Sequence, residues 1–383
     1  MTLYEPAEDS FLIQKHIKEY AVGNVLEIGT GSAILAVEAA HSEKVKSVLA
    51  VDIQKEVIEH CKKTIKKKKT EVIKKITFKQ SNLFQNVKGR FDTIIFNPPY
   101  LPADRRDPDI TLDGGKHGYE TVELFLNQAN KYLTESGKIL LLFSSLTKKN
   151  KIDEIIKANL FTAKEIGQQH ISFETLYVYV IEKSNILKEI EKKKITDVNY
   201  FAKGRRGLAY TGIYNGKNVI IKISNPESEA VSTIPFEEKW LKKMNELHIG
   251  PKFYFATDFF LVMEYINGLE ILNFLEKSTK QNTLKVLKDL LKQMLVLDKK
   301  GIIKQEMTHP HKHIIVRNNK PVLIDFERCR YTEQSKNINQ ILQFLTSYKV
   351  AELLQKKGIV LDKKKIDALG KEYSKTKKLP KIF

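Results

Sequence analysis

Short apolar runs alternate with helical patterns through the first half of the chain, as is typical of an α/β protein. The run Phe91–Phe96 has the alternating apolar character of a buried parallel strand. Further strands are predicted at Val25–Ile28, Ser47–Val51 and Lys75–Lys79, and a helical pattern covers Ala33–Ala40. These elements predict a sheet with helices on both faces, whose binding crevice opens at the carboxyl ends of the strands.

The tetrapeptide Asn97-Pro98-Pro99-Tyr100 directly follows the strand that ends at Phe96. The two prolines fix φ near −65° and push Asn97 towards an extended conformation. We therefore expect its amide and the carbonyls of Asn97 and Pro98 to form a rigid row of acceptors. Such a row suits a planar –NH2 group, whose hydrogens are held while its nitrogen faces an electrophile. Tyr100 is expected to pack against the target side chain, or else only to close the pocket wall. For the tetrapeptide as a whole, a plain turn after a strand is the alternative.

A glycine turn after the first strand indicates a cofactor crevice. Gly29 and Gly31 let the backbone approach a ligand closely, and Asp52, at the end of the next strand, can accept hydrogen bonds from both ribose hydroxyls. Dehydrogenases carry a similar turn, but this one lacks their third glycine and shares a domain with the Asn-Pro-Pro-Tyr motif. The turn and this motif together resemble those of class I S-adenosylmethionine-dependent methyltransferases, and the resemblance implies these cofactor residues: Glu27, Gly29, Gly31, Asp52, Asn82, Leu83 and Asn97.

Four segments in order carry a resemblance to a known family. Asn97–Tyr100 resembles motif IV of class I amino-methyltransferases, and Tyr4–Phe11 resembles the opening of the HemK-like protein-glutamine methyltransferases, in particular their short archaeal and eukaryotic branch. The resemblance continues at Asp113–Glu120 and Leu140–Leu146 and covers residues 1–182. It implies a seven-stranded Rossmann-like methyltransferase fold that methylates the Gly-Gly-Gln glutamine of a class-one translation release factor. Eukaryotic relatives also imply a small zinc-binding activator subunit.

The expected chemistry needs orientation more than acid–base catalysis. An amide nitrogen is a poor nucleophile, so the enzyme must hold it in line with the methyl group. We expect the Asn97 side-chain oxygen to take one hydrogen and the Pro98 carbonyl the other, with Asn97, Pro98 and Tyr100 as the catalytic set. Glu5, Glu8 and Asp9 form either a solvated helix start or a segment from which one carboxylate closes over the cofactor. A nucleic-acid adenine methyltransferase is the alternative, although no target-recognition domain is evident.

Composition adds the cellular setting. The chain has 383 residues, 42% of them apolar, which predicts two domains with a core each. Two cysteines offer no disulfide framework, and no leader or membrane span is evident, so we expect a cytoplasmic protein. A net charge of +19 favours proximity to RNA or ribosomes, whereas runs such as Lys66–Lys69 favour solvated lysine.

The second half resembles a protein kinase. A glycine-containing loop, Gly204–Gly212, precedes the strand Val219–Ile223, as a phosphate-covering loop precedes the phosphate-binding lysine, here Lys222. Gly204 and Gly207 are the loop glycines expected near ATP. Glu238, in a helix predicted at 236–247, is the expected partner of Lys222, and Glu237 is the second choice.

The later kinase segments resemble archaeal RIO-like predicted serine/threonine kinases over residues 199–348. Met263–Tyr265 lies where adenine would meet the backbone, and Asp325 ends a strand as the expected Mg²⁺ ligand. The resemblance implies that Glu306 replaces the catalytic aspartate and His313 the metal-binding asparagine, so we expect slow phosphotransfer. A zinc site among the histidines and a non-catalytic docking module are the alternatives.

The predicted organisation is therefore a methyltransferase domain over residues 1–183, whose last strand is Glu174–Glu182, and an α+β kinase-like domain over 199–383. A charged linker, 184–198, contains a connecting helix, and a basic tail begins at Lys363.

Overall fold

The computed structural model describes residues 5–65, 71–103, 109, 111–204, 207–224 and 234–383. The chain divides into two compact units, residues 1–200 and 201–383, which are described separately. Tyr4, the lysine run 66–69 and the loop arginines Arg205 and Arg206 lie outside the described residues. Within the described ranges, no helix combines the length and apolar character that crossing a membrane requires.

The first unit is built on a seven-stranded sheet with the order β3-β2-β1-β4-β5-β7-β6. Strands β1 to β5 pair in parallel, whereas β7 is antiparallel to both β5 and β6, so the sheet is mixed. The predicted strands are confirmed, and β4 begins and ends where the apolar alternation does. The strands are β1 Gly23–Ile28, β2 Val45–Asp52, β3 Ile76–Gln80, β4 Phe91–Phe96, β5 Leu133–Ser144, β6 Phe161–Ile171 and β7 Glu174–Lys183.

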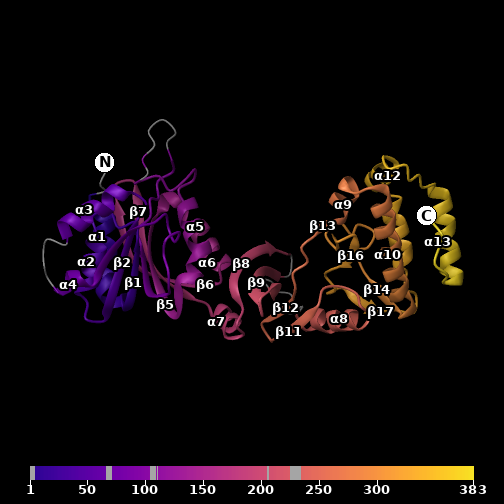
Figure 1. The fold of residues 1–383 in the computed structure, drawn as a ribbon, viewed down its shortest axis with the longest axis horizontal. Coiled ribbons are helices and arrows are strands. Elements are labelled where there is room, and N and C mark those ends of the chain that lie inside the picture. The colour runs from indigo at the N-terminus through magenta and orange to yellow at the C-terminus, as the bar shows by residue number, and fades with distance from the viewer. Residues whose placement is uncertain (1–4, 66–70, 104–108, 110, 205–206, 225–233) are drawn as a thin grey trace. The chain divides into compact units, whose positions relative to one another are not determined.

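Helices cover both faces of this sheet (Figure 1). One core joins α1, α2 and α3 to sheet residues such as Val25, Ile95 and Leu140. On the opposite face, Phe125 of α5 packs on Phe96 with ring centroids 4.6 Å apart. The helices are α1 Glu8–Tyr20, α2 Ile34–His41, α3 Lys55–Ile65, α4 Glu71–Lys74, α5 Glu120–Ala129, α6 Lys149–Ala158 and α7 Asn185–Lys192.

The charged stretch after β7 forms the expected connecting helix, α7, and it is tied to the sheet. Ser184 caps the helix by accepting a hydrogen bond from Leu187 N–H. The Lys183 side chain is fully buried, and its ammonium donates to the Leu133 carbonyl at 3.0 Å and to Glu191 at 2.8 Å. A charge buried this deeply requires those partners, because unpaired it would cost several kcal/mol, of order 3–5.

The second unit begins with a five-stranded sheet of order β11-β12-β10-β9-β8, in which β10 is antiparallel to β9 and β12. One helix, α8, lies between β10 and β11 in sequence and places Trp240 and Met244 in the core. The predicted strand and helix around Lys222 are thus confirmed. The elements are β8 Thr196–Lys203, β9 Gly207–Tyr214, β10 Lys217–Ser224, α8 Ile234–Glu246, β11 Phe253–Ala256 and β12 Phe260–Glu264.

The remainder of the second unit is mainly helical, with two small sheets, β13-β15-β16 and β14-β17 (Figure 1). Its elements are β13 Leu269–Glu270, α9 Ile271–Lys277, α10 Lys280–Lys299, β14 Ile302–Lys304, β15 Ile314–Arg317, β16 Lys320–Leu323, β17 Cys329–Tyr331, α11 Asn337–Leu345, α12 Tyr348–Gln355 and α13 Lys363–Thr376.

The predicted basic tail is mostly a packed helix. In α13, Ile366 and Tyr373 belong to the core of the second unit. The Tyr373 hydroxyl donates to the buried carboxylate of Asp298 at 2.7 Å, and Asp298 also accepts from Asn337 N–H at the start of α11. The lysines predicted a basic tail, and the apolar residues spaced among them make one face of α13 part of the core.

Candidate active site

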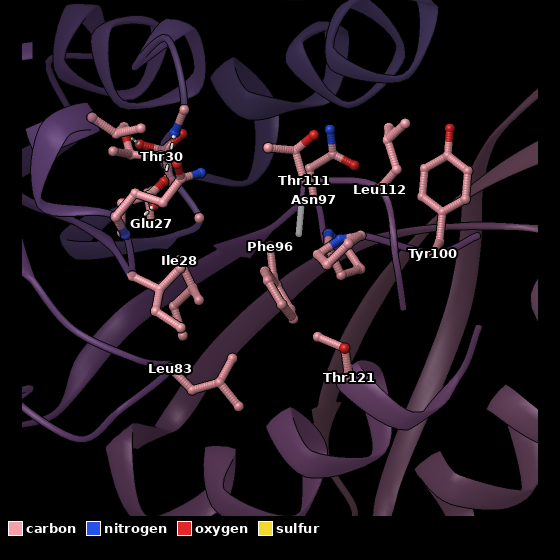
Figure 2. A pocket seen from close by; sticks show the side chains of 18 of the residues that line it. Glu27, Ile28, Thr30, Leu83, Phe96, Asn97, Tyr100, Thr111, Leu112 and Thr121 are labelled. Carbon is pink, nitrogen blue, oxygen red and sulfur yellow. Dashed lines mark hydrogen bonds between the residues drawn. The ribbon is translucent and has the colours of Figure 1, made fainter. Parts of the chain in front are cut away.

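A cavity of about 260 Å³ opens at the carboxyl ends of the parallel strands of the first unit. Figure 2 shows Glu27 and Thr30 at one end of this pocket, Tyr100 at the other, and Asn97 between them. The structure places all the residues predicted for the cofactor and the acceptor along its wall: Glu27, Gly29, Gly31, Asp52, Asn82, Leu83, Asn97, Pro98 and Tyr100. Ligand binding at this edge is the rule for such sheets.

The glycine turn after β1 lines the end of the pocket at which Glu27 and Thr30 lie, called here the first end. Gly29 and Gly31 both have positive φ, 67° and 49°, which glycine adopts without strain. Gly31 N–H donates to one Asp52 carboxylate oxygen at 3.1 Å, and Gln54 N–H donates to the other at 3.0 Å. Burial raises the pKa of Asp52, while these two backbone hydrogen bonds oppose the increase. The turn therefore holds the Asp52 carboxylate at the pocket wall.

Glu27 is the most deeply buried carboxyl of the pocket, with 1% of its surface exposed. It accepts a hydrogen bond from the Thr30 hydroxyl. Burial raises the pKa of Glu27 to about 8, and the nearby charge of Asp52 adds to the increase, while the Thr30 hydrogen bond opposes it. In the absence of a cation, Glu27 is therefore mostly protonated at pH 7.

Asn97, directly after β4, presents an unused acceptor. Its Nδ2 donates to Asp9 Oδ2 at 2.9 Å. Its Oδ1 is buried and has no hydrogen-bond partner among the described residues. A buried polar atom without a partner costs about 1–3 kcal/mol, so in this pocket it marks the place where a ligand donor is expected.

Tyr100 forms the far wall of the pocket, away from the glycine turn (Figure 2). Burial raises the pKa of its hydroxyl, and the negative charges of Asp9, Glu174 and Glu8 raise it further. Tyr100 therefore stays a neutral hydroxyl over the physiological range and does not act as a base.

Two glycines of the 113–120 segment pack directly on the backbone of Asn97–Leu101. A Cβ on Gly114 would lie 2.7 Å from the Pro99 carbonyl oxygen, and one on Gly118 would lie 2.4 Å from the Tyr100 carbonyl oxygen. Leu101 N–H donates to Leu112 O, and Gly114 N–H donates to Leu101 O. This segment thus fixes the path of the motif, and neither glycine tolerates a larger residue.

Some pocket residues were not predicted from the sequence. Asp9 was one of three acidic residues considered as a carboxylate that closes over the cofactor, and its contact with Asn97 was not predicted. Several apolar and hydroxyl residues that line the pocket carry no motif of their own: Phe96, Thr111, Leu112, Thr121 and Leu124. The glycine spacing of residues 114–118 was the available signal that this segment approaches another backbone closely.

The comparisons with known proteins agree with this architecture, which defines a class I methyltransferase. Residues 8–174 match the family described as "Methyltransferase small domain". A Methanocaldococcus jannaschii protein described as "Putative protein N5-glutamine methyltransferase" is 34% identical over 181 residues, which are 46% of this chain and 89% of that protein. The chain therefore belongs to the protein N5-glutamine methyltransferase family.

Other relatives match shorter stretches. A Lactococcus lactis "Release factor glutamine methyltransferase" is 31% identical over 30% of this chain and 46% of its own length. A Bradyrhizobium diazoefficiens "Ribosomal protein uL3 glutamine methyltransferase" is 32% identical over 31% of this chain and 40% of its own length. The chain thus spans less than half the length of either. A solved structure of the E. cuniculi Mtq2-Trm112 complex, described as responsible for methylation of the eRF1 translation termination factor, covers 48% of this chain and all of its own at 20% identity, with a TM-score of 0.39.

A second cluster of charged side chains lies in the second unit. The Lys222 ammonium on β10 pairs with Glu237 of α8 and lies 3.7 Å from Asp325 Oδ1. Burial alone would lower the pKa of Lys222, but the charges of Glu237 and Asp325 outweigh it and raise the pKa. The choice of Glu238 as partner was wrong: that side chain pairs with Lys242 on the exposed side of α8 at 2.7 Å. Helical periodicity explains the correction, because neighbouring residues point about 100° apart and only Glu237 faces inward.

Glu306 and His313 extend this cluster. His313 Nε2 lies 3.4 Å from Glu306 Oε2, and its Nδ1 lies 3.8 Å from Asp325 Oδ2. Glu306 also pairs with Arg328. Burial and the neighbouring charge of Lys304 lower the pKa of His313. In the part of the chain that the structure describes, no three His, Cys, Asp or Glu side chains are grouped as metal ligands, so the zinc alternative gains no support.

The residues predicted for the phosphate-covering loop and the adenine contact form hydrogen bonds within the fold. Gly204 N–H, directly after β8, donates to Gly207 O at the start of β9 at 2.8 Å. At the expected adenine contact, Glu264 N–H donates to Lys252 O and Tyr265 N–H to Asn218 O. Those two N–H groups are therefore used within the fold and are not available to a nucleotide base.

Proposed function

We propose that the first unit transfers a methyl group from S-adenosylmethionine to the side-chain amide nitrogen of a glutamine, in the Gly-Gly-Gln loop of a class-one release factor. The single observation that carries this proposal is the buried Asn97 Oδ1, which has no partner among the described residues and lies on the wall of a pocket that continues to the glycine turn. An amide –NH2 supplies the hydrogen that this oxygen lacks.

The first end of the pocket fits the cofactor. Gly29 and Gly31 leave the turn without side chains, and Asp52 holds acceptor oxygens at the wall, as ribose hydroxyls require. Leu83 supplies an apolar contact beside Asn82. When bound, the cofactor supplies a methyl group on a positively charged sulfur, which is the electrophile of the reaction.

The motif residues orient the acceptor. Asn97 Oδ1 accepts one amide hydrogen and the Pro98 carbonyl accepts the other, so the nitrogen is held with its face towards the first end of the pocket. Orientation of this kind is worth several kcal/mol of the barrier, about 7–11 in well-aligned systems. The glutamine nitrogen gains the methyl group as the bond from that methyl carbon to sulfur breaks, with the electron pair of the broken bond left on sulfur as a neutral thioether. The nitrogen then loses one proton to solvent, and because the proton leaves after transfer, no base is needed before it.

The names of the relatives support glutamine as the methyl acceptor more strongly than they support any one protein as the substrate. One relative is named for a release factor and another for ribosomal protein uL3, yet both are named for glutamine. A release factor remains our proposed substrate because the N-terminal motifs resemble the release-factor branch. An adenine N6 acceptor would use the same Asn97 geometry and is the runner-up.

The test is methyl transfer from labelled S-adenosylmethionine to a release factor, to ribosomal protein uL3 and to DNA or RNA, with products identified by mass spectrometry. We expect N5-methylglutamine in the Gly-Gly-Gln loop. Asn97→Ala should abolish transfer and keep cofactor affinity by calorimetry, whereas Asn127→Ala, an exposed asparagine on α5, should behave as wild type. Exclusive formation of N6-methyladenine would refute the glutamine proposal.

We propose as a second function that the second unit binds Mg²⁺-ATP as an atypical, RIO-like kinase domain. The support is the ion pair between Lys222, on the third strand of its sheet, and Glu237, on the following helix, with Asp325 within reach of the same ammonium. This is the arrangement that positions ATP phosphates and metal in kinases. Asp325 and His313 are the proposed metal-binding residues, and Glu306 is the proposed acid near the acceptor hydroxyl.

Phosphotransfer is expected to be slow. Glu306 is one methylene longer than aspartate and is held by Arg328, and imidazole is a poor ligand for Mg²⁺. Calorimetry with Mg²⁺-ATP and a radiolabelled phosphotransfer assay separate binding from chemistry. Binding without transfer would favour a nucleotide-sensing or docking module, and no binding at millimolar ATP would refute the nucleotide site.

The resemblance to the eukaryotic branch also leads us to propose a small zinc-binding activator subunit as a partner. Purification of the tagged chain from its own cells, with zinc analysis of any small co-purifying subunit, tests this proposal. Full methyltransferase activity of the chain alone would remove the need for such a partner.

A further inference from the structure

One contact in the pocket determines which end of the Asn97 amide faces the acceptor. Asn97 Nδ2 donates to Asp9 Oδ2 at 2.9 Å. The Asp9 oxygen accepts this hydrogen bond from an N–H donor, so the nitrogen of the amide must point towards Asp9. The oxygen then has to point the other way, and it is the buried atom without a partner among the described residues.

Asp9 is itself held in place. It lies in the first turn of α1 with 4% of its surface exposed, and its Oδ1 accepts a hydrogen bond from Ser10 N–H at 2.6 Å. One carboxylate oxygen is thus fixed by the helix backbone and the other by Asn97. Because Ser10 N–H is a donor, the Oδ1 position must be occupied by an acceptor, which in Asp9→Asn is the oxygen of the introduced amide.

We propose that Asp9 is the positioning and specificity-determining residue of the acceptor site: it sets the polarity of the Asn97 amide, so that the site accepts a hydrogen-donating –NH2 group and rejects a carboxylate. This inference rests on the proposed function of the first unit. Its consequence is discrimination between glutamine and glutamate, which have nearly the same shape and differ in the group that faces Asn97 Oδ1.

Asp9→Asn tests the polarity directly. Ser10 N–H requires the oxygen of the introduced amide, which leaves the –NH2 group of that amide facing Asn97. The Asn97 amide then turns over, so that its oxygen meets the introduced –NH2 and its own –NH2 faces the acceptor. We expect kcat for a Gly-Gly-Gln substrate to fall on the order of ten- to a hundredfold, because the acceptor is misplaced. Affinity for S-adenosylmethionine should stay unchanged.

A competitor peptide gives a result that a merely structural role would not produce. A Gly-Gly-Glu peptide should inhibit wild type far less than a Gly-Gly-Gln peptide does. In Asp9→Asn the preference for the glutamine peptide, measured as the ratio of the two inhibition constants, should fall by about tenfold or more. This change corresponds to one hydrogen bond lost by the glutamine peptide and one gained by the glutamate peptide.

The exchange variant Asp9→Asn with Asn97→Asp restores the polarity with the same atoms in swapped places. The carboxylate at position 97 accepts from the amide at position 9 with one oxygen and presents the other to the acceptor. We expect at least a tenfold recovery of kcat over Asp9→Asn and a return of the preference for glutamine. Glu19→Gln, an exposed residue on the same helix, removes the same charge and should change neither quantity.

A nuclear magnetic resonance measurement separates this inference from the proposed function. In wild type, the Asn97 side-chain –NH2 protons should show Overhauser contacts to protons of α1, and these should disappear in Asp9→Asn. If wild type methylates no glutamine, the proposed function fails, and these contacts still decide the Asn97 polarity. Absence of the contacts in wild type, unchanged kcat and peptide preference in Asp9→Asn, or an exchange variant no better than the single variant would each overturn the inference.

Discussion

Replacing Glu27 by glutamine should stabilise the first unit in the absence of cofactor, and increasingly so as pH rises. Glu27 is 1% exposed and burial raises its pKa from 4.5 to about 8. Because the folded pKa lies above the unfolded value, its contribution to stability is greatest below pH 4.5 and is lost as pH rises through the interval to about 8. Glutamine has nearly the same shape, still offers an oxygen to the Thr30 hydroxyl, and does not ionise.

The magnitude follows from the size of the pKa increase. Each pKa unit corresponds to about 1.4 kcal/mol, so the buried carboxyl costs about 3 kcal/mol of stability at pH 7 and about 5 kcal/mol above pH 9. Glu27→Gln removes this cost. The gain is reduced by about 1–3 kcal/mol if an amide hydrogen of the introduced glutamine is left without an acceptor. The difference in stability between the variant and wild type should therefore grow by about 3 kcal/mol between pH 4.5 and pH 7.

Hydrogen exchange of β1 and β4 peptides, followed by mass spectrometry, measures the unfolding free energy of the first unit. The single tryptophan, Trp240, lies in the second unit, so its fluorescence serves as an internal reference that Glu27→Gln should not change. Glu43→Gln, an exposed residue before β2, is the matched control and should show no pH-dependent gain. Parallel stability profiles of Glu27→Gln and wild type from pH 4.5 to 8 would refute the assignment of a protonated Glu27.

Three further predictions concern ligands. Asp52→Ala should weaken S-adenosylmethionine binding by about 1.5–3 kcal/mol through the loss of charged hydrogen bonds, and unchanged affinity by calorimetry would place the ribose elsewhere. Lys222→Ala and Glu237→Ala should both lower Mg²⁺-ATP affinity, whereas Glu238→Ala should not, because Glu238 pairs with an exposed lysine; equal effects of the two glutamates would contradict the pairing. Glu306→Ala should reduce ATP turnover and spare binding, and loss of binding would assign Glu306 to the nucleotide instead.

Strands β1 to β4 were predictable because they are short apolar runs with polar or glycine ends, whereas β6 was not, because most of its residues are polar and exposed or half-buried. Such runs specify both a strand and the edge at which its ligand residues meet. That the predicted cofactor residues line one pocket was predictable for the same reason, since Gly29 directly follows β1 and Asp52 ends β2. The partner of Asn97 was not, because Asp9 lies 88 positions away and nothing local to either residue specifies their contact.

The second unit shows the same limit on a smaller scale. Periodicity placed Lys222 on a strand and two glutamates on the next helix, yet only the rotation of α8 about its axis decides between Glu237 and Glu238. That rotation is set by Trp240 and Met244 packing into the core, which is a tertiary effect. The role of α13 was missed because its lysines dominate the composition, although a few apolar residues determine where the helix packs.

The pairing of Lys183 with Glu191 has a practical consequence for anyone who wishes to produce the first unit alone. Ending the polypeptide at the close of β7 would discard Glu191 and leave a buried ammonium with one carbonyl partner. Such a fragment would be expected to misfold or precipitate, and its inactivity could be mistaken for a requirement for the second unit or for a partner protein. A fragment that retains α7 keeps the charge neutralised, so any inactivity it showed would not come from an unpaired Lys183.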